Sequence, residues 1–395
     1  MTILRFIRFV IGYNNSMINK NRLIRLTRDL IRINSENPPG NEKEISGFIK
    51  KYLGRIGVKC SLIEFAKGRT NVLALIKSKE PKAKTILISP HLDTVPAGRG
   101  WKVAPFEGRV INGKIYGRGA TDCKGNLAVA IETINSIIED KAEIKNNILF
   151  AATADEETGS GFGLIPLLKK NFLKCDYALI LDSDKFDIVI AQKGLIHFKV
   201  SVFGRKAHGA YPWKGINAIN IASDIIQDLK KYKFKYKKHP LLHPPTINIG
   251  TIHGGDKVNM VSDWCEFEVD IRYLPGMSSK EILPDIRRVI AKRAKKFNVK
   301  IDGIQDPYEI SKSHPLVERL AAVSKKYAKS CRGGTVCRPY KGSEGATVIT
   351  FFKDKNIPAV AWGFGAQECC HVNDEYASIE SLYKGAKALE KFLAK

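Results

Sequence analysis

Residues 86–94 read Ile-Leu-Ile-Ser-Pro-His-Leu-Asp-Thr, an apolar run that ends at a histidine and an aspartate two residues apart. A short apolar run of this kind predicts a buried strand. In an open α/β sheet, ligands bind at the carboxyl ends of the strands. His91 is therefore placed to offer a neutral imidazole to a metal ion, and Asp93 to hydrogen-bond the other ring nitrogen. A purely structural histidine is the alternative.

Helix and strand patterns alternate on either side of this stretch. Apolar residues with helical spacing predict helices, and short apolar or β-branched runs predict strands. The helices are expected at 22–33, 41–53 and 126–138, and the strands at 71–76, 85–89, 148–153 and 177–181. Such alternation predicts an α/β fold with a mostly parallel sheet flanked by helices.

The middle of the chain has a different order of elements. We expect a strand, a helix, two strands, a helix and a strand at 195–203, 216–229, 246–252, 264–273, 279–296 and 299–302. This β-α-β-β-α-β order is that of a ferredoxin-like α+β sandwich. We therefore predict a discontinuous catalytic domain (20–195 and 309–395), an inserted lid domain (196–308) and a disordered N-terminal extension (1–19).

Composition indicates a globular protein: of 395 residues, 44% are hydrophobic and 27% are charged. No run reaches the ~20 apolar residues that span a bilayer, so no membrane partner is expected. Eight cysteines without paired spacing are typical of a reduced, cytoplasmic protein. The basic, apolar segment 1–13 also leaves open a signal peptide, a membrane anchor or a true start at Met17.

The formal net charge is +25, which first suggests nucleic-acid binding. The Lys and Arg residues are spread over the whole chain, however, and the densest run, at 230–238, is short. Such a tract usually forms a solvated surface. We therefore expect no nucleic-acid partner, and a positive field that attracts anionic substrates.

Acidic residues mark two further positions where strands end or helices begin. Asp122 directly precedes an expected helix in a glycine-rich turn, where it can bridge two cations or simply cap the helix. Asp155, Glu156 and Glu157 follow the apolar strand at 148–153. One such carboxylate can bind a metal ion while its neighbour accepts a proton from water, a solvated loop being the alternative.

Two more segments carry candidate metal ligands. Asp182 and Asp184 follow the strand at 177–181, and His371 precedes an acidic turn at 372–376. Two histidines and several carboxylates form the mixed nitrogen and oxygen donor set that suits Zn²⁺, Co²⁺ or Mn²⁺. Their joint occurrence at strand ends, rather than any one residue, predicts a metal centre.

From about Leu23 to the C-terminus, the sequence resembles the M20 metallopeptidase family, in the branch of acetylornithine deacetylase and succinyl-diaminopimelate desuccinylase. The matching motifs are SENPPGNE (35–42), HLDTVPAG (91–98), Trp101 with PFEGRVINGKIYGRGATDCKG (105–125), ADEETGSG (154–161), AHGAYPWKGINAI (207–219) and HVNDEY (371–376). The motifs are long and specific. They imply a catalytic domain like that of dinuclear-metal exopeptidases, with two divalent metal ions, Zn²⁺ foremost.

The resemblance also implies a ligand set. Asp122 would bridge the two ions. The other ligands would be His91 and Asp182 for one ion, and Glu157 and His371 for the other.

Two more residues of the catalytic domain receive roles from the resemblance. Asp93 would orient His91, and Glu156 would act as the general base. Position 182 carries Glu or Asp in the family, and its spacing to the Lys-Gly pair that follows favours it over Asp184.

The lid domain contributes further residues in the family. His208 resembles the histidine that stabilises the tetrahedral oxyanion, and Asn259 and Arg272 match positions that hold the substrate carboxylate, which an arginine pairs with bidentately. Ser343 and Gly345 belong to a segment that lines the pocket of relatives. Because relatives dimerise through the lid, and its histidine and asparagine can come from the partner, we expect a homodimer.

The chain departs from the family pattern near the pocket. Cys123 stands where methionine is usual, and 343–345 reads Ser-Glu-Gly where Thr/Ser-Asp is common. Gly-Phe-Gly at 363–365 replaces Gly-Pro-Gly, and Cys369 and Cys370 precede the histidine ligand. No metal ligand is affected, so these departures bear on specificity rather than on the chemistry.

We predict a dinuclear-metal hydrolase that cleaves the amide bond of an N-acyl amino acid, such as N-acetylornithine or N-succinyl-diaminopimelate. A di- or tripeptidase or a carboxypeptidase with the same site is the alternative, because the bond type is shared. A basic nucleic-acid binder without activity is a more distant one.

Overall fold

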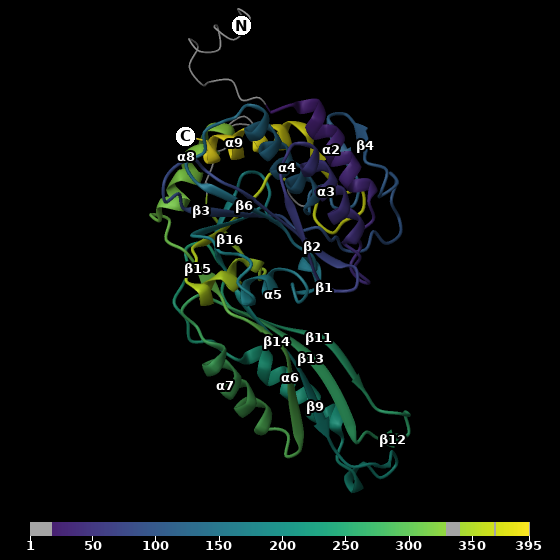
Figure 1. Cartoon of the computed structure of the whole chain (residues 1–395). Helices are drawn as coiled ribbons and strands as arrows, with labels where there is room; N and C mark the ends of the chain where they lie inside the picture. Colours follow the sequence, from purple (N-terminus) through teal and green to yellow (C-terminus); the bar gives the residue numbers. More distant parts are fainter. Residues whose placement is uncertain (1–17, 329–339, 367–368, 395) are drawn as a thin grey trace, which may run out of the picture. The chain divides into compact units, whose positions relative to one another are not determined.

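The computed structural model describes residues 18–328, 340–366 and 369–394. These residues form two compact units (Figure 1). The first unit comprises the described residues up to Ile190, Ile310–Lys341 and those from Phe351 onward, and the second comprises Ala191–Glu309 and Gly342–Thr350.

The first unit is built around a mixed sheet with a parallel centre. Its strands run in the order β1-β2-β6-β3-β7-β17-β8. The pairs β6/β3, β3/β7 and β7/β17 are parallel, whereas the pairs toward both edges are antiparallel. The strands are Cys60–Ala66 (β1), Arg69–Ile76 (β2), Thr85–Ser89 (β3), Asn147–Ala152 (β6), Tyr177–Ile180 (β7), Ile188–Gln192 (β8) and Ala359–Trp362 (β17).

The central strands are apolar on both faces. In β3, the residues from Ile86 to Ser89 are all buried, and β6 and β17 are equally apolar. Strands of this kind suit a parallel sheet that is covered by helices on both sides. The α/β fold with a mainly parallel sheet is thus confirmed, and it is the apolar run at 86–88 that occupies its centre.

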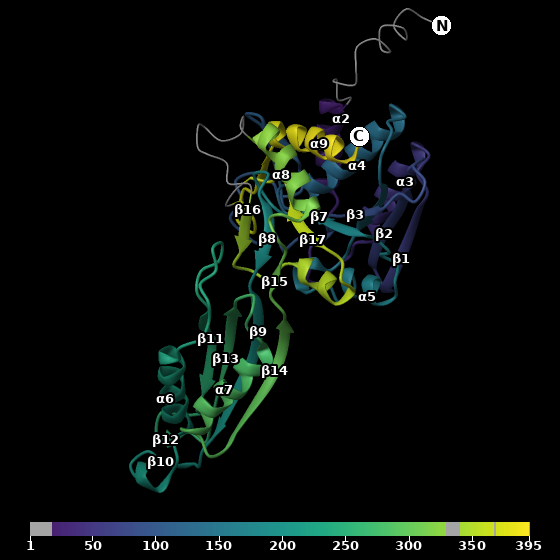
Figure 2. The same ribbon diagram turned by 90° about the vertical axis from the view of Figure 1, so that its left-hand side faces the viewer.

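Helices lie on both sides of this sheet. Figures 1 and 2 show α4 and α9 on one side and α5 on the other. Within the described part of the chain, no helix is long and apolar enough to cross a membrane. The helices are Lys20–Arg32 (α2), Lys43–Arg55 (α3), Lys124–Glu139 (α4), Leu164–Lys169 (α5), Pro315–Ala328 (α8) and Ile379–Leu393 (α9).

The N-terminal extension predicted for residues 1–19 lies almost entirely outside the described residues. Asn19, which is described, is the N-cap of α2, and its side chain accepts a hydrogen bond from the backbone N–H of Arg22. Such a cap satisfies one of the free donors at the start of the helix.

Three strands of this sheet, β1, β8 and β17, have no counterpart among the strands that the sequence predicted. β1 forms an antiparallel hairpin with β2, and the chain turns at Gly68, whose φ of +80° favours glycine. The hairpin sends β2 back antiparallel to β6, so the strand expected at 71–76 is present but does not run parallel to the central strands. A separate three-stranded sheet contains Arg109–Ile111 (β4), Lys114–Tyr116 (β5) and Tyr376–Ser378 (β18).

The second unit has the β-α-β-β-α-β order that the sequence predicted. Its antiparallel sheet runs in the order β11-β13-β9-β14. Alternate residues of β9 are buried, and they pack with apolar residues of α6 and α7 in one core. The elements are Gly194–Phe203 (β9), Ala218–Lys231 (α6), Thr246–Gly254 (β11), Trp264–Tyr273 (β13), Ser279–Ala291 (α7) and Phe297–Gln305 (β14).

Several shorter elements complete the described secondary structure. β10 and β12 pair with each other, β15 pairs with the last residues of β8, and β16 also pairs with β8. Their bounds are Ala207–His208 (β10), Pro212–Lys214 (η2), Met260–Val261 (β12), Tyr308–Glu309 (β15), Tyr340–Ser343 (β16) and Val348–Lys355 (η3).

Four aromatic side chains fill the core of the first unit beside β17. The ring of Phe364 lies edge to face against Trp362 and Phe186, with centroids 4.8 and 4.9 Å away, and Trp362 also contacts Phe392. Gly385 of α9 faces the same cluster, because a Cβ atom built there would lie 2.3 Å from the Phe364 ring. The helix can therefore approach the ring only where it carries a glycine.

Gly385→Ala is expected to lower the free energy of unfolding by about 1–3 kcal/mol, because the added methyl group overpacks the core. Glycine to alanine inside a helix otherwise stabilises by roughly 0.5–1 kcal/mol. Gly47→Ala is the matched control, because a Cβ at Gly47 of α3 meets nothing within 4 Å. Urea unfolding of both variants should give opposite signs, and stabilisation by Gly385→Ala would contradict this packing.

Candidate metal centre

The carboxyl ends of the parallel strands bring the candidate residues to one edge of the sheet. His91 follows β3, the single 3₁₀ turn η1 (Glu156–Thr158) follows β6, and Asp182 follows β7. His371 comes after β17, and Asp122 directly precedes Cys123, the N-cap of α4. Residues far apart in the sequence thus meet at a single site.

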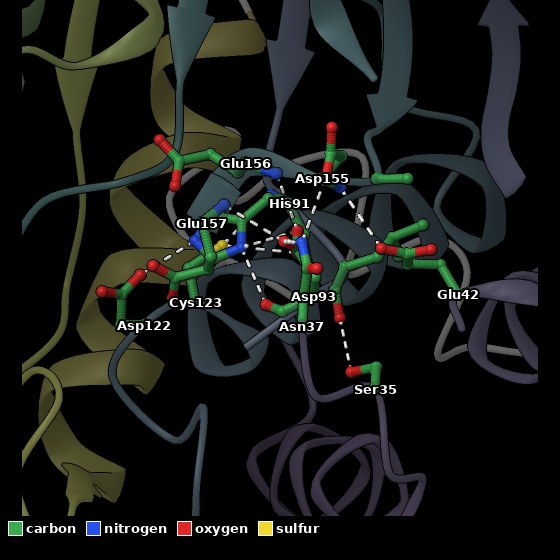
Figure 3. A network of polar contacts seen from close by, with 12 residues as sticks. Ser35, Asn37, Glu42, His91, Asp93, Asp122, Cys123, Asp155, Glu156 and Glu157 are labelled. Carbon is green, nitrogen blue, oxygen red and sulfur yellow. Dashed lines mark hydrogen bonds and ion pairs between the residues drawn. The ribbon is translucent and has the colours of Figure 1, made fainter. Parts of the chain in front are cut away.

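Asp122 lies between the two histidines. Its Oδ1 is 2.8 Å from Nε2 of His91, and its Oδ2 is 3.2 Å from Nε2 of His371. Nε2 of His371 is also 3.1 Å from Oε2 of Glu157. Figure 3 shows Asp122 and Glu157 beside His91. Each oxygen of Asp122 therefore faces a different imidazole, as a bridging carboxylate would require.

Two groups of possible ligand atoms form around His91. The first contains His91, Asp122 and Glu157, and the second contains His91, Glu156 and Asp182, with the atoms of each group within 4.8 Å of one another. Asp184 belongs to neither group, and its Oδ1 pairs with Nζ of Lys341 at 3.3 Å. The structure thus separates the two acids that follow β7, and it brings Asp182 into the cluster.

The donor set fits divalent cations. Among the described residues, Oε1 of Glu157 is buried without a hydrogen-bond partner. Burial raises the pKa of Asp182 to about 7, and the negative charge of Asp122 adds to the shift. Burial also raises the pKa of Glu156 well above its usual value, with Asp182 adding to it. Cations bound among these carboxylates would relieve both the crowding of charge and the unpaired oxygen.

Metal affinity is expected to rise with pH. Hydrogen bonds to Asp122 and Glu157 raise the pKa of His371 to about 10, so near neutral pH this imidazole carries a proton that a cation would have to displace if His371 is a ligand, as predicted. Each displaced proton makes the apparent affinity rise about tenfold per pH unit. Calorimetric titration with Zn²⁺ between pH 6 and 8, in buffers of different ionisation enthalpy, measures both the affinity and the protons released. An affinity that is constant over this range would contradict the arrangement.

Asp93 was predicted to hydrogen-bond the second ring nitrogen of His91 and so to orient the ring. In the structure, Nδ1 of His91 lies 2.9 Å from the backbone oxygen of Asp93 and 3.6 Å from its Oδ1. The closest partner of Nδ1 is therefore the backbone oxygen of Asp93. The carboxylate of Asp93 instead accepts hydrogen bonds from the backbone N–H groups of Glu156 and Glu157.

Glu375 supports the loop that carries Asp122, a role that the sequence analysis missed. Its carboxylate accepts hydrogen bonds from the backbone N–H groups of Gly119, Thr121 and Asp122 at 2.8–3.0 Å. It also pairs with Nη1 of Arg118 at 2.7 Å. Both charged residues are almost fully buried. Their presence in two matching motifs was the available signal, but only the fold shows that the motifs meet.

The remaining candidate residues lie in the second unit. The exposed His208 is adjacent to Asn259, because the backbone N–H of Gly209 donates to the backbone oxygen of Asn259 at 2.8 Å. The guanidinium of Arg272 donates to both carboxylate oxygens of Asp270 at 2.8 and 3.0 Å.

The other two predicted pocket residues contact each other. The hydroxyl of Ser343 donates to the backbone oxygen of Gly345 at 3.0 Å. The segment Gly342–Thr350 packs with the second unit, although the sequence analysis placed it in the catalytic domain. The roles expected for the second-unit residues stay predictions.

Histidines and carboxylates that cluster at the carboxyl ends of parallel strands in an α/β fold are typical of a metal-dependent enzyme, and the sequence profile identifies this one as a hydrolase. The chain belongs to peptidase family M20/M25/M40, whose sequence profile matches residues 87–395. The resemblance to the acetylornithine deacetylase branch is also confirmed. The chain is 26% identical to an acetylornithine deacetylase of Vibrio cholerae, over 90% of this chain and 92% of that protein.

Other relatives extend this likeness. The chain is 30% identical to an uncharacterized metallohydrolase of Methanococcus maripaludis, over 92% of this chain and 96% of the relative. Among solved structures, a tripeptidase from Staphylococcus aureus superposes with a TM-score of 0.77 at 23% identity, over 95% of this chain and 98% of that one. A dinuclear metal binding peptidase from Bacillus subtilis superposes with a TM-score of 0.69 at 19% identity, over 94% and 97%. At these identities the structural likeness concerns the fold.

Proposed function

We propose that the protein hydrolyses the amide bond of an N-acyl amino acid with the help of two Zn²⁺ ions, for which Co²⁺ or Mn²⁺ could substitute. The observation that carries this proposal is Asp122, whose two oxygens each face a different histidine. His91 and Asp182 would complete one site, and Glu157 and His371 the other. The similarity to acetylornithine deacetylase supports the choice of substrate class.

Glu156 is the proton carrier in this proposal. When bound, the cations would acidify a water molecule and polarise the substrate carbonyl. Glu156 lies next to the ligand Glu157 in one turn, and its carboxylate is grouped with His91 and Asp182. It would accept the proton of the attacking water and then deliver it to the nitrogen of the leaving amine. Asp93 would meanwhile hold the imidazole of His91 in place.

We assign the substrate contacts to residues of the second unit, on the family resemblance. His208 would donate to the oxyanion that develops on the carbonyl oxygen. Asn259 and Arg272 would bind the substrate carboxylate, and Arg272 would then have to share or exchange its partner Asp270. The segment with Ser343 and Gly345 would line the pocket for the acyl group or side chain.

A peptidase that uses the same site is the second candidate. The fold likeness to the Staphylococcus aureus tripeptidase favours it, and a short peptide presents the same amide bond and carboxylate. A carboxypeptidase would cleave the amide bond next to the free carboxylate of a longer peptide.

Initial hydrolysis rates on a panel of N-acetyl and N-succinyl amino acids, dipeptides and tripeptides decide between these candidates. The panel is run on chelated protein with Zn²⁺ or Co²⁺ added back. Metal-dependent release from N-acyl amino acids supports the deacylase. Release from peptides alone would replace it with the peptidase.

We further propose a homodimer that forms through the second unit and works in the cytoplasm. The family resemblance supports the dimer, and the scattered cysteines support a reducing compartment. Sedimentation velocity should show a species of about twice the 44.0 kDa chain mass. A single 44.0 kDa species at working concentration would contradict the proposed dimer.

A further inference from the structure

The motif SENPPGNE at 35–42 matched the family but received no role. In the structure, Asn37 and Glu42 from this motif join a buried network that reaches the turn with Glu156 and Glu157. Figure 3 shows this network, with dashed lines between Asp93, Asn37 and the turn. The motif therefore lies next to the proposed base without belonging to the ligand set.

Asp155, which directly precedes the base, has an unusual backbone conformation. Its φ of +65° lies in the left-handed region, which costs free energy for any residue with a Cβ atom. Its Oδ2 accepts a hydrogen bond from the backbone of Phe162 at 3.0 Å, and its Oδ1 accepts one from Thr158. Its own N–H donates to Glu42 at 3.3 Å. This conformation sets the direction in which the next peptide group, that of Glu156, enters the turn.

Arg69 of β2 provides the positive charge of the network. Its Nε and Nη2 donate to the two oxygens of Glu42 at 2.8 and 2.7 Å, and Nη2 also donates to Oδ1 of Asp155 at 2.8 Å. The guanidinium lies over the ring of Phe162, and Arg69 is only 7% exposed. A planar fork can hold two carboxylates in fixed positions, which the single charge of a lysine cannot do.

Asn37 and Asp93 connect this network to the proposed base, Glu156. The side-chain Nδ2 of Asn37 donates to Oδ2 of Asp93 at 2.9 Å and to Oδ1 of Asp155 at 3.2 Å. Oδ1 of Asp93 accepts the N–H of Glu156 at 3.0 Å, and its Oδ2 accepts the N–H of Glu157 at 3.1 Å. Asp93 thus holds both backbone amides of the segment that carries the proposed base and ligand, and Asn37 links Asp93 to Asp155, the residue before this segment.

Gly40 in the same motif leaves room for the guanidinium. A Cβ atom on Gly40 would lie 2.3 Å from Cζ of Arg69, and the φ of Gly40 is +78°. The motif therefore provides an amide at Asn37 for Asp93 and Asp155, the absence of a side chain at Gly40, and a carboxylate at Glu42 for Arg69.

We propose that Arg69, which is bound by Glu42 and lies against Gly40, is a positioning residue for the turn that carries Glu156 and Glu157. It acts by fixing Asp155 and, through Asn37, Asp93, so that the base and the ligand keep their relative orientation. This inference rests on the proposed function for the roles of Glu156 and Glu157, but the geometry of the turn can be measured independently of any activity.

Arg69→Lys tests the proposal, because it keeps the charge and removes the fork. We expect kcat to fall about 10- to 100-fold with KM changed less than threefold, and Zn²⁺ affinity to fall by a similar factor, as for other residues that orient ligands. Hydrogen exchange of the Glu156 and Glu157 amides should accelerate, because their acceptor Asp93 loses its fixed position.

Arg22→Lys is the matched control. Arg22 also forms a fork with a buried acid, through Nε and Nη2 to the carboxylate of Glu132, in the same unit but without contact to the turn. It is expected to lose stability while kcat, metal affinity and the exchange of the Glu156 amide stay at their wild-type values. A purely structural role of Arg69 would make the two lysine variants behave alike.

A second pair of variants tests the position of Arg69 without removing any polar group. In Gly40→Ala, the added methyl group clashes with the guanidinium of Arg69, and the backbone is strained because φ is positive. Gly57→Ala is the control: its backbone is strained in the same way, at a φ of +84°, but a Cβ there meets nothing within 4 Å. Only Gly40→Ala should lower kcat and speed the exchange of the turn amides, and this pair serves if Arg69→Lys does not fold.

Each outcome has a distinct meaning. Slower turnover, weaker metal binding and faster exchange in Arg69→Lys or Gly40→Ala, but not in their controls, support the proposal. Wild-type kcat and wild-type exchange in both variants overturn it. If the wild-type protein hydrolyses nothing or binds no metal, the proposed function fails, and the exchange of the Glu156 and Glu157 amides alone then decides whether Arg69 positions the turn.

Discussion

Glu156→Ala is expected to lower kcat by about 10²–10⁴-fold, the range that general base catalysis contributes, while metal remains bound. Glu156 is proposed to move the proton from the water to the leaving amine, and the alanine side chain cannot accept a proton. The metal ligands proposed for both ions are other residues, so two ions per chain should still be found by elemental analysis. The measurement is kcat on the best substrate of the panel, at saturating metal.

Two further variants make this result specific. Glu156→Gln keeps the size of the side chain and should be as slow as the alanine variant, because it also lacks the base. Glu44→Ala removes an exposed acid from α3 and should keep wild-type turnover. Near-normal turnover in Glu156→Ala would show that another group carries the proton.

Asp122→Asn is expected to abolish hydrolysis and to weaken metal binding by more than about 100-fold, beyond the loss typical of residues that only orient a ligand. An amide has one neutral oxygen, so it cannot bridge two cations as a carboxylate does. Thermal unfolding gives a readout that needs no substrate. At a free Zn²⁺ concentration of 100 times its Kd, metal should stabilise the wild-type protein by about 2.7 kcal/mol, and the variant by almost nothing.

Asp184→Asn is the matched control for this change. Asp184 also lies close to the cluster along the chain, only two residues after Asp182, but its carboxylate pairs with Lys341. We expect metal to stabilise this variant as it does the wild type. If Asp184→Asn lost the metal and Asp182→Asn kept it, the assignment of the ligand after β7 would be wrong.

The clustering of the candidate ligands was predictable because of a geometric property of parallel sheets. Strands such as β3 and β7 are apolar on both faces, which identifies them in the sequence, and their carboxyl ends must lie at the same edge. His91 and Asp182 therefore had to come near each other once the parallel sheet was inferred. The second unit was predictable for a similar reason, since the spacing of its strands and helices is typical of one known order.

The network behind the turn was not predictable in this way. Charged residues are mostly exposed, so nothing in the sequence marks Arg69 or Glu42 as buried. Their pairing becomes visible only when β2 is placed next to the start of α3. The direction of β2 also depends on the hairpin with β1, a strand with several exposed residues whose weak apolar pattern gave no clear signal. The left-handed backbone at Asp155 likewise follows from tertiary contacts, and its residue type only permits it.

Helix ends were the other source of error. The helix expected to reach residue 296 ends at Ala291, although Ala294 beyond its end is still buried in the core. The strand that follows is longer than expected and runs over Phe297–Gln305. Such boundaries depend on capping and packing, whereas the existence of an element depends on its repeated apolar pattern.

The most direct test of the two-metal proposal is a titration of the chelated protein with Zn²⁺ or Co²⁺, in which hydrolysis of the best panel substrate is followed against metal equivalents per chain. A dinuclear hydrolase should show no turnover without metal and should reach full activity as the second equivalent binds. Full activity with one equivalent would contradict the role of Asp122 as a bridge. Turnover in the metal-free protein, or failure to bind any metal, would contradict the proposed function as a whole.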